Sequence, residues 1–109
     1  MNVLKTAEFL ADVELQYEWY AERAGWDVAD RYLSAIEGTC TLLGTQPLLG
    51  PRAGFMHLRI KEWRFLVAFR PFHRHVLFYE VVTDAVEMRR AMDGSRDLPR
   101  RLLEPSGAA

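Results

Sequence analysis

The sequence contains a single cysteine, Cys40, and no long hydrophobic segment. One thiol cannot form an internal disulfide, so the composition gives no sign of a secreted protein stabilised by disulfides. Its apolar runs are far shorter than the roughly 20 residues that a membrane-spanning helix needs. The first five residues, Met-Asn-Val-Leu-Lys, also lack the charged and then apolar regions of a signal peptide. We therefore expect a cytoplasmic protein that is not inserted in a membrane.

Motifs for cofactor or metal chemistry are also missing. The sequence has no glycine-rich phosphate loop and no pattern typical of a Ser/His/Asp triad. Its histidines, His57, His73 and His75, come without the cysteine pair or His-Glu motif typical of zinc sites. Cys40 falls on the apolar stripe of a predicted helix and is expected in the core. We therefore expect no cofactor and no metal ion.

The net charge is small but unevenly distributed. The formal net charge is -1 at pH 7. Residues 1–43 hold three basic and eight acidic residues, a balance of -5, whereas residues 44–109 hold eleven basic and seven acidic residues, a balance of +4. Either these charges serve solubility and cluster by chance, or a basic face meets an anion or an acidic protein. The length of 109 residues predicts one domain, residues 1–105, with a disordered tail at residues 106–109.

Two amphipathic helices are predicted in the first half of the chain. Apolar residues recur at steps of three and four between residues 7 and 24, with Thr6 as the N-cap and Gly25 as the terminating glycine. A second helix is expected between Asp27 and Gly44, where Asp27 and Asp30 imitate a capping box. The short connection predicts an antiparallel helical hairpin.

The second half of the chain has the two-residue period of strands. Val3-Leu4 is a candidate for a short first strand. After Gly54, Met56, Leu58 and Ile60 alternate with polar residues, and an alternation of opposite phase follows over residues 63–69, so a bulge or a turn is expected at residues 61–62. Residues 75–82 are apolar on both faces, as in a central strand, and residues 85–92 form the last strand. A short basic tail, Arg100-Arg101, comes after it.

This order predicts the fold class α+β, with elements β-α-α-β-β-β. The helical hairpin is expected on one face of a small, mainly antiparallel twisted sheet, whose other face is open to water or to a partner. Arg89 and Arg90 are adjacent on the last strand and are therefore predicted to point to opposite faces. An arginine on a sheet pairs with a neighbouring acid, here Glu80 or Glu87, or belongs to a basic surface for nucleic acid or an acidic protein. The residues leave both interpretations open.

Several motifs together resemble one known family. They are the early acidic residue Asp12 with Tyr17 and Tyr20, the Pro47-x-x-Gly50 pattern, the Leu58-Arg59 pair, the strand Val76-Leu77-Phe78-Tyr79, and the terminal Gly94-x-Arg96-Asp97-Leu98-Pro99. Over nearly the whole chain this pattern resembles the ParE-type toxins of the RelE/ParE toxin–antitoxin superfamily. Two residues depart from it: Glu80 stands where the family often has arginine, and Asp93 stands where histidine is common.

The resemblance implies the toxin of a type II toxin–antitoxin system, which inhibits DNA gyrase by binding and lacks an active site of its own. It also implies a hetero-oligomer with a cognate antitoxin, for which the ribbon-helix-helix, ParD-like type is the candidate. The residues expected to bind the target are Arg59, Arg89, Arg90 and Arg96. Those expected to bind the antitoxin are Leu15, Trp19, Trp63 and Phe72.

Two alternatives stay open at this point. RelE-like relatives cut messenger RNA on the ribosome, which requires a proton donor and acceptor beside cations. After Arg96 the chain has no Tyr, His or Lys, so such a site would have to use residues such as His73, His75 and Tyr79 with Arg59 or Arg90. The other alternative is an inactive relative that only binds.

Overall fold

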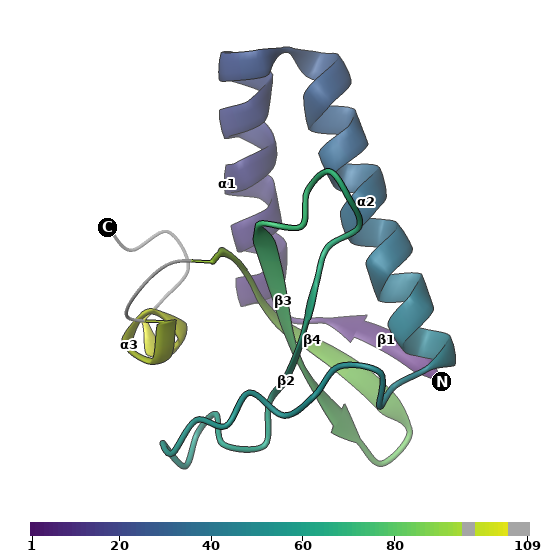
Figure 1. Cartoon of the computed structure of the whole chain (residues 1–109), viewed down its shortest axis with the longest axis vertical. Helices are drawn as coiled ribbons and strands as arrows, with labels where there is room; N and C mark the ends of the chain where they lie inside the picture. The colour runs from purple at the N-terminus through teal and green to yellow at the C-terminus, as the bar shows by residue number, and fades with distance from the viewer. Residues whose placement is uncertain (95–97, 105–109) are drawn as a thin grey trace.

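The chain folds into two long helices, a mixed sheet and a short C-terminal helix (Figure 1). This computed structural model describes residues 1–94 and 98–104. The elements are, in chain order, β1 (Asn2–Lys5), α1 (Ala7–Ala24), α2 (Trp26–Thr45), β2 (Arg64–Val67), β3 (His75–Val82), β4 (Ala85–Asp93) and α3 (Leu98–Leu103). None of the helices within the described residues is long and apolar enough to cross a membrane.

The helical hairpin forms as its apolar pattern predicts, but its turn is tighter than expected. Thr6 caps α1 by accepting a hydrogen bond from the Phe9 N–H at 3.1 Å. Gly25, with a φ of 95°, reverses the chain in one residue, a conformation that glycine adopts at little cost. The predicted capping box of Asp27 and Asp30 is therefore wrong, because α2 already begins at Trp26. Asp30 instead accepts a hydrogen bond from the Tyr17 hydroxyl at 2.7 Å.

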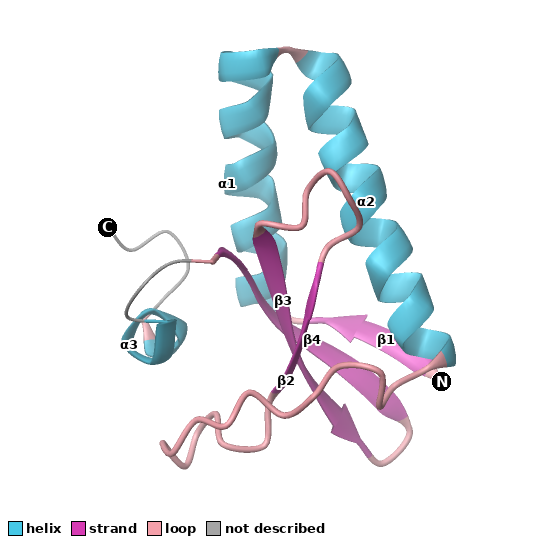
Figure 2. Ribbon diagram, viewed as in Figure 1, coloured by secondary structure: helices cyan, strands magenta, loops and turns pink. Residues whose placement is uncertain are grey.

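The sheet has the strand order β1-β4-β3-β2 (Figure 2). β1 pairs with β4 in parallel, and the other two pairs are antiparallel. The predicted α+β class and element order are confirmed, with β3 as one of the two central strands. The helical hairpin packs against one face of this sheet, and β4 forms contacts with both long helices.

The predicted strand around Met56, Leu58 and Ile60 is wrong. Residues 55 and 56 have no regular structure, residues 57–62 form a bend and turns, and the next strand, β2, starts only at Arg64. Met56 and Leu58 are 91% and 82% exposed, so their alternation with polar residues does not mark a buried strand face. The phase change predicted at residues 61–62 therefore lies in a turn that leads into β2.

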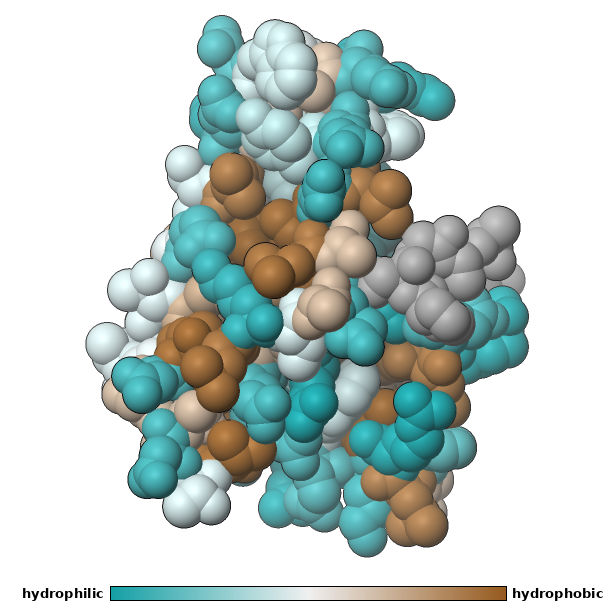
Figure 3. All heavy atoms as spheres, turned by 180° about the vertical axis from the view of Figure 1, so that it is seen from behind, coloured by the Kyte–Doolittle hydropathy of each residue, from teal (hydrophilic) through white to brown (hydrophobic). Residues whose placement is uncertain are grey.

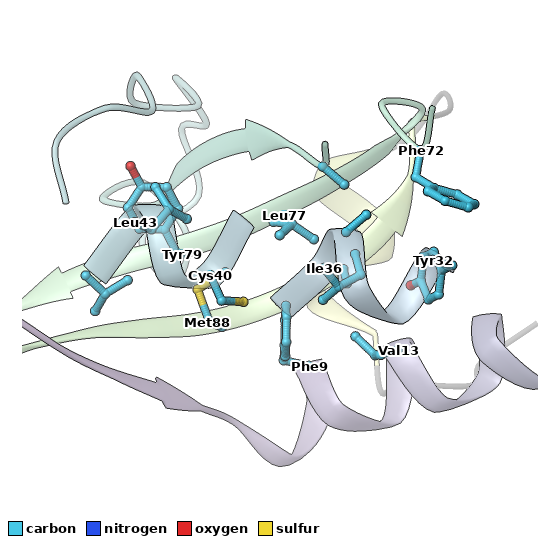
Figure 4. Packing of buried hydrophobic residues seen from close by; sticks show 14 residues of the cluster. Phe9, Val13, Tyr32, Ile36, Cys40, Leu43, Phe72, Leu77, Tyr79 and Met88 are labelled. Atoms are coloured by element: carbon cyan, nitrogen blue, oxygen red, sulfur yellow. The ribbon is translucent and has the colours of Figure 1, made fainter. Parts of the chain in front are cut away.

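The apolar core of the described residues has two parts on opposite faces of the sheet. The larger part lies between the helices and the sheet and includes Phe9, Ile36 and Met88 (Figure 4). The smaller part, the second cluster, consists of Ile60, Trp63, Phe78, Met92 and Leu102. The face that was expected to be open is thus partly covered, because the loop before β2 and α3 supply side chains to it.

The C-terminal region also differs from the prediction. Residues 98–103 form α3 instead of a basic tail, and Leu102 at its end is 4% exposed. The residues predicted as a disordered tail, 106–109, lie outside the described residues. On the reverse face of the molecule the apolar side chains gather in separate patches among polar ones (Figure 3).

Candidate functional site

A groove runs beside α1. It has a volume of about 660 Å³ and is called the α1 groove below. One wall is the exposed side of α1, the floor is formed by the start of β3 and the end of β4, and the other wall is α3. Its lining residues are Asp12, Leu15, Gln16, Trp19, Tyr20, Arg74, His75, Arg90, Ala91, Met92, Asp93, Arg101 and Glu104.

A buried ion pair lies at the floor of the α1 groove. The Arg90 guanidinium donates from Nε and Nη2 to the two carboxylate oxygens of Asp12, at 2.7 and 3.0 Å. The Ala91 N–H donates to the same carboxylate at 3.0 Å. β1 ends at Lys5 and pairs with β4 only as far as Met88, so Asp12 supplies the acceptor that a longer β1 would have provided. The side chains of Arg90 and Asp12 are 5% and 7% exposed.

Arg90 also holds α3. Its Nη1 donates to the carbonyl oxygens of Glu104 at 2.6 Å and of Leu102 at 3.3 Å. The last carbonyls of a helix have no partner within the helix, and a cation there also complements the helix dipole. One guanidinium therefore joins α1, β4 and α3. Arg90 was predicted to bind the target, but its burial gives it this structural role.

A β-bulge decides where Arg89 lies. Phe78 on β3 pairs with Arg90, whereas Tyr79 pairs with Met88, which leaves Arg89 as the extra residue on β4. Residues directly opposite each other share a face, so Arg90 lies with Phe78 on the face of the second cluster. Tyr79 and Met88 are in the larger core, so Arg89 also lies on the face of the second cluster. The prediction that the two arginines point to opposite faces is wrong.

Arg89 bridges two acidic side chains. Its Nη2 lies 2.7 Å from a carboxylate oxygen of Glu80 and 3.5 Å from one of Glu87. Glu80 and Glu87 are directly opposite on β3 and β4, where two like charges alone would repel. Of the two interpretations left open by the sequence, the pairing of a sheet arginine with these acids is the one that Arg89 shows. Glu80, one of the two departures from the family pattern, thus has a partner within the chain.

Tyr20 and His75 form a second polar contact in the α1 groove. The Tyr20 hydroxyl and His75 Nε2 are 2.8 Å apart. Burial lowers the pKa of His75, with Asp93 raising it and Arg74 lowering it to smaller extents. Burial likewise raises the pKa of the Tyr20 hydroxyl, so both groups are held neutral near pH 7.

Leu15 and Trp19 form the apolar wall of the α1 groove. They are 49% and 47% exposed, respectively, on the outer side of α1. The indole of Trp19 packs edge-on against Tyr20, with ring centroids 5.4 Å apart, and the Arg23 guanidinium lies 5.2 Å from its centre. These contacts hold the indole on the rim of the groove while leaving about half of its surface free.

The other residues predicted to bind partners lie elsewhere. Trp63 and Phe72 are 9% and 7% exposed and belong to the second cluster and the larger core, respectively. Arg59 is exposed on the loop before β2, and Arg96 lies outside the described residues. The α1 groove thus brings Leu15, Trp19 and Arg90 together, but not the remaining predicted residues.

The residues considered for a nuclease site are also separated. His75 and Arg90 both line the α1 groove. Tyr79 points away from it: its buried hydroxyl donates to the Pro47 carbonyl at 2.8 Å and accepts from the Gly50 N–H at 2.9 Å. Within residues 1–94 and 98–104, no cluster of His, Cys, Asp or Glu is arranged to hold a metal ion.

Sequence reasoning missed two features of the groove. It did not identify α3 as a wall of the groove. The six residues of α3 are too few to show helical periodicity in the sequence. It also did not pair Tyr20 with His75, which are 55 residues apart. The acidic residue Asp12 was noted as part of the family pattern, but its partner was not.

Comparison with known proteins gives a family match and a fold match. A protein-family model described as "ParE toxin of type II toxin-antitoxin system, parDE" matches residues 3–98. A solved structure described as the chromosomal ParDE toxin–antitoxin system from P. aeruginosa has a TM-score of 0.72 and 17% sequence identity, and the alignment covers 87% of this chain and 97% of that one. At this identity the structural likeness concerns the fold alone. No curated protein matches the sequence.

Proposed function

The chain belongs to the ParE toxin family of type II toxin–antitoxin systems, and on that basis we propose that it inhibits DNA gyrase by binding and is neutralised by a cognate antitoxin. The observation that carries this proposal is the family match over residues 3–98, which spans both long helices and strands β2 to β4. The gyrase target comes from the resemblance drawn from the sequence.

The α1 groove supports the antitoxin part of the proposal. An amphipathic helix binds a groove through apolar side chains at helical spacing, while charges at the rim orient it. Leu15 and Trp19 offer the apolar wall, and Arg74 and Glu104 are among the charged residues that line the groove. Phe72 is buried in the larger core and packs against Tyr20, so in this proposal it supports the groove, whereas Trp63 packs in the second cluster, away from the groove.

The four arginines predicted to bind the target contribute to the proposed gyrase binding in different ways. Arg59 is exposed and Arg89 is half-buried, so both side chains can reach a partner, and Arg96 stays a proposed contact. Arg90 contributes by holding α3 in place. Arginine suits this recognition because its planar group forms several directed hydrogen bonds to carboxylates or phosphates.

The test is a supercoiling and cleavage assay with purified DNA gyrase and the antitoxin-free protein. Inhibition that is relieved by adding the cognate antitoxin is the expected result. Trp19→Ala should require more antitoxin for the same relief, because it removes the largest apolar side chain from the groove wall. Absence of inhibition at micromolar excess would refute the gyrase target, and cleavage of messenger RNA on ribosomes would then identify the RelE-like alternative.

A further inference from the structure

A closed loop, residues 53–63, leads into β2 and is called the 53–63 loop below. Its ends are joined, because the Ala53 N–H donates to the Trp63 carbonyl at 2.8 Å. Beside this bond, Arg52 and Glu62 form an ion pair at 3.0 Å. A compact surface loop whose ends are close is an Ω-loop, a type that frequently carries function. The shape of the 53–63 loop is therefore set by the protein and not by a partner.

Three apolar side chains fasten the loop to the sheet. Ile60 is 1% exposed and Trp63 is 9% exposed, both within the second cluster. Phe55 packs against Phe78 with ring centroids 5.9 Å apart. The backbone between them is shaped by a turn in which the Ile60 N–H donates to the His57 carbonyl at 3.0 Å. The loop is thus anchored on both sides of its tip.

The tip of the loop presents two apolar side chains to solvent. Met56 is 91% exposed and Leu58 is 82% exposed, more than any other large apolar side chain in the described part of the chain. The anchors show that the loop can bury apolar side chains, yet these two point outward. Met is enriched in protein interfaces, and its flexible thioether adapts to an irregular apolar recess.

The charge of the loop's own tip is positive. His57, Arg59 and Lys61 are exposed and alternate with the apolar residues. Residues 53–61 contain no acidic residue, and the next one, Glu62, is engaged by Arg52. A surface with an apolar centre and cations beside it complements a protein recess that is rimmed by carboxylates.

We propose that the 53–63 loop is the surface with which the toxin grips its target protein, with Met56 and Leu58 entering an apolar recess and Arg59 and Lys61 meeting acidic side chains at its rim. This inference rests on the proposed function and names the part of the chain that performs it. The described residues that line the α1 groove come from α1, β3, β4 and α3, from the residue before β3 and from the residue after α3, and none comes from this loop. In Figure 1 the loop lies at the opposite end of the molecule from the tip of the helical hairpin. Antitoxin and target therefore use different residues.

The test uses the double variant Met56→Ser/Leu58→Ser in the full chain. Because both side chains are exposed, the melting temperature should stay within about 3 °C of that of the wild type. The concentration for half-inhibition of gyrase should rise roughly tenfold or more, and growth inhibition should be lost in parallel. Antitoxin affinity should change less than about twofold. The matched control is Leu10→Ser/Leu48→Ser, at leucines that are 51% and 67% exposed outside the loop, and it should inhibit like the wild type.

A charge variant tests the rim separately. Arg59→Glu/Lys61→Glu should slow association with gyrase and remove most of its salt dependence, because complementary charges act mainly on the association rate. If neither Met56→Ser/Leu58→Ser nor Arg59→Glu/Lys61→Glu changed the association with gyrase, the proposal would be overturned.

Other outcomes also decide between explanations. If the loop variant inhibited gyrase and growth like the wild type, the proposed role of the loop would be refuted while the gyrase target would stand. Weakened antitoxin binding by the same variant would make the loop an antitoxin surface, and a wild-type dimer that the variant converts to a monomer would make it a self-association surface. Loss of binding to naked DNA in step with the loss of inhibition would assign the loop to nucleic acid. If the wild type arrests growth without inhibiting gyrase, the gyrase target is refuted. Growth arrest by the loop variant, compared with that by the wild type, would then still test the role of the loop. A wild type that does neither would overturn both.

Discussion

The carboxylate of Asp12 and the guanidinium of Arg90, 78 residues apart in the sequence, meet at 2.7 Å in a buried ion pair. The same guanidinium donates to the carbonyl oxygens of Leu102 in α3 and of Glu104 just after it, and the same carboxylate accepts from the backbone of β4. The pair thus joins the first helix, the last strand and the C-terminal helix, and it forms the floor of the α1 groove. Asp12 and Arg90 therefore act by positioning α3.

Removing the acid from this pair should destabilise the protein strongly. Asp12→Ala leaves the Arg90 charge buried without its partner, which typically costs about 3–5 kcal/mol. Urea denaturation would measure the change in the free energy of unfolding. Arg100→Ala is the control, because the Arg100–Glu104 pair is largely exposed at the arginine and should contribute less than about 1 kcal/mol. Equal, small effects of the two substitutions would contradict the structural role of Asp12.

Stability should fall when the pH drops below the ordinary pKa of histidine. Burial lowers the pKa of His75 in the folded state, so between the folded and unfolded pKa values the unfolded chain binds more protons. The contribution of His75 is therefore fully present above about pH 6.5 and is lost as the pH falls toward the folded pKa. Unfolding free energies of the wild type and His75→Gln, measured between pH 5 and 8, would test this. His75→Gln should show a weaker pH dependence, and His73→Gln, at an exposed position, should match the wild type.

The two tryptophans predicted to bind antitoxin should behave differently. Trp63→Ala empties a buried site in the second cluster and should cost about 3–5 kcal/mol of stability. Trp19 is about half exposed, so Trp19→Ala should cost less than about 1.5 kcal/mol while lowering antitoxin affinity roughly tenfold or more. Thermal melting and titration calorimetry would separate the two effects. If Trp19→Ala unfolded the protein, the indole would belong to the core.

The Pro47-x-x-Gly50 pattern has a packing explanation that can be tested at Gly50. A Cβ at this position would meet the Phe65 carbonyl oxygen and lie 2.8 Å from the Tyr79 hydroxyl. Because the first neighbour is backbone, Gly50→Ala should cost about 1–3 kcal/mol through a forced backbone shift. Tyr79→Phe removes the hydroxyl that bonds to both ends of the pattern and should cost a similar amount. Leu49→Ala, at a half-exposed neighbour, should leave the melting temperature nearly unchanged.

Local patterns in the sequence determined the elements that depend on one segment alone. The first helix was predicted at residues 7–24 and forms at Ala7–Ala24, because its apolar period and its Thr6 cap are both local signals. The strand predicted at residues 75–82 coincides with β3, since an apolar run between turns has few alternatives. These elements, taken in order, were enough for the fold class, and local residue motifs were enough for the family resemblance.

Tertiary structure decided what depends on which segments meet. Met56, Leu58 and Ile60 alternate like a strand, but the bond between Ala53 and Trp63 closes that segment into a loop and leaves it no partner strand. The bulge at Arg89 depends on the register between β3 and β4, and the burial of Arg90 depends on a carboxylate 78 residues away. Periodicity reports the geometry of one chain segment, whereas register, ion pairing and loop closure are set by the packing of segments that are distant in the sequence.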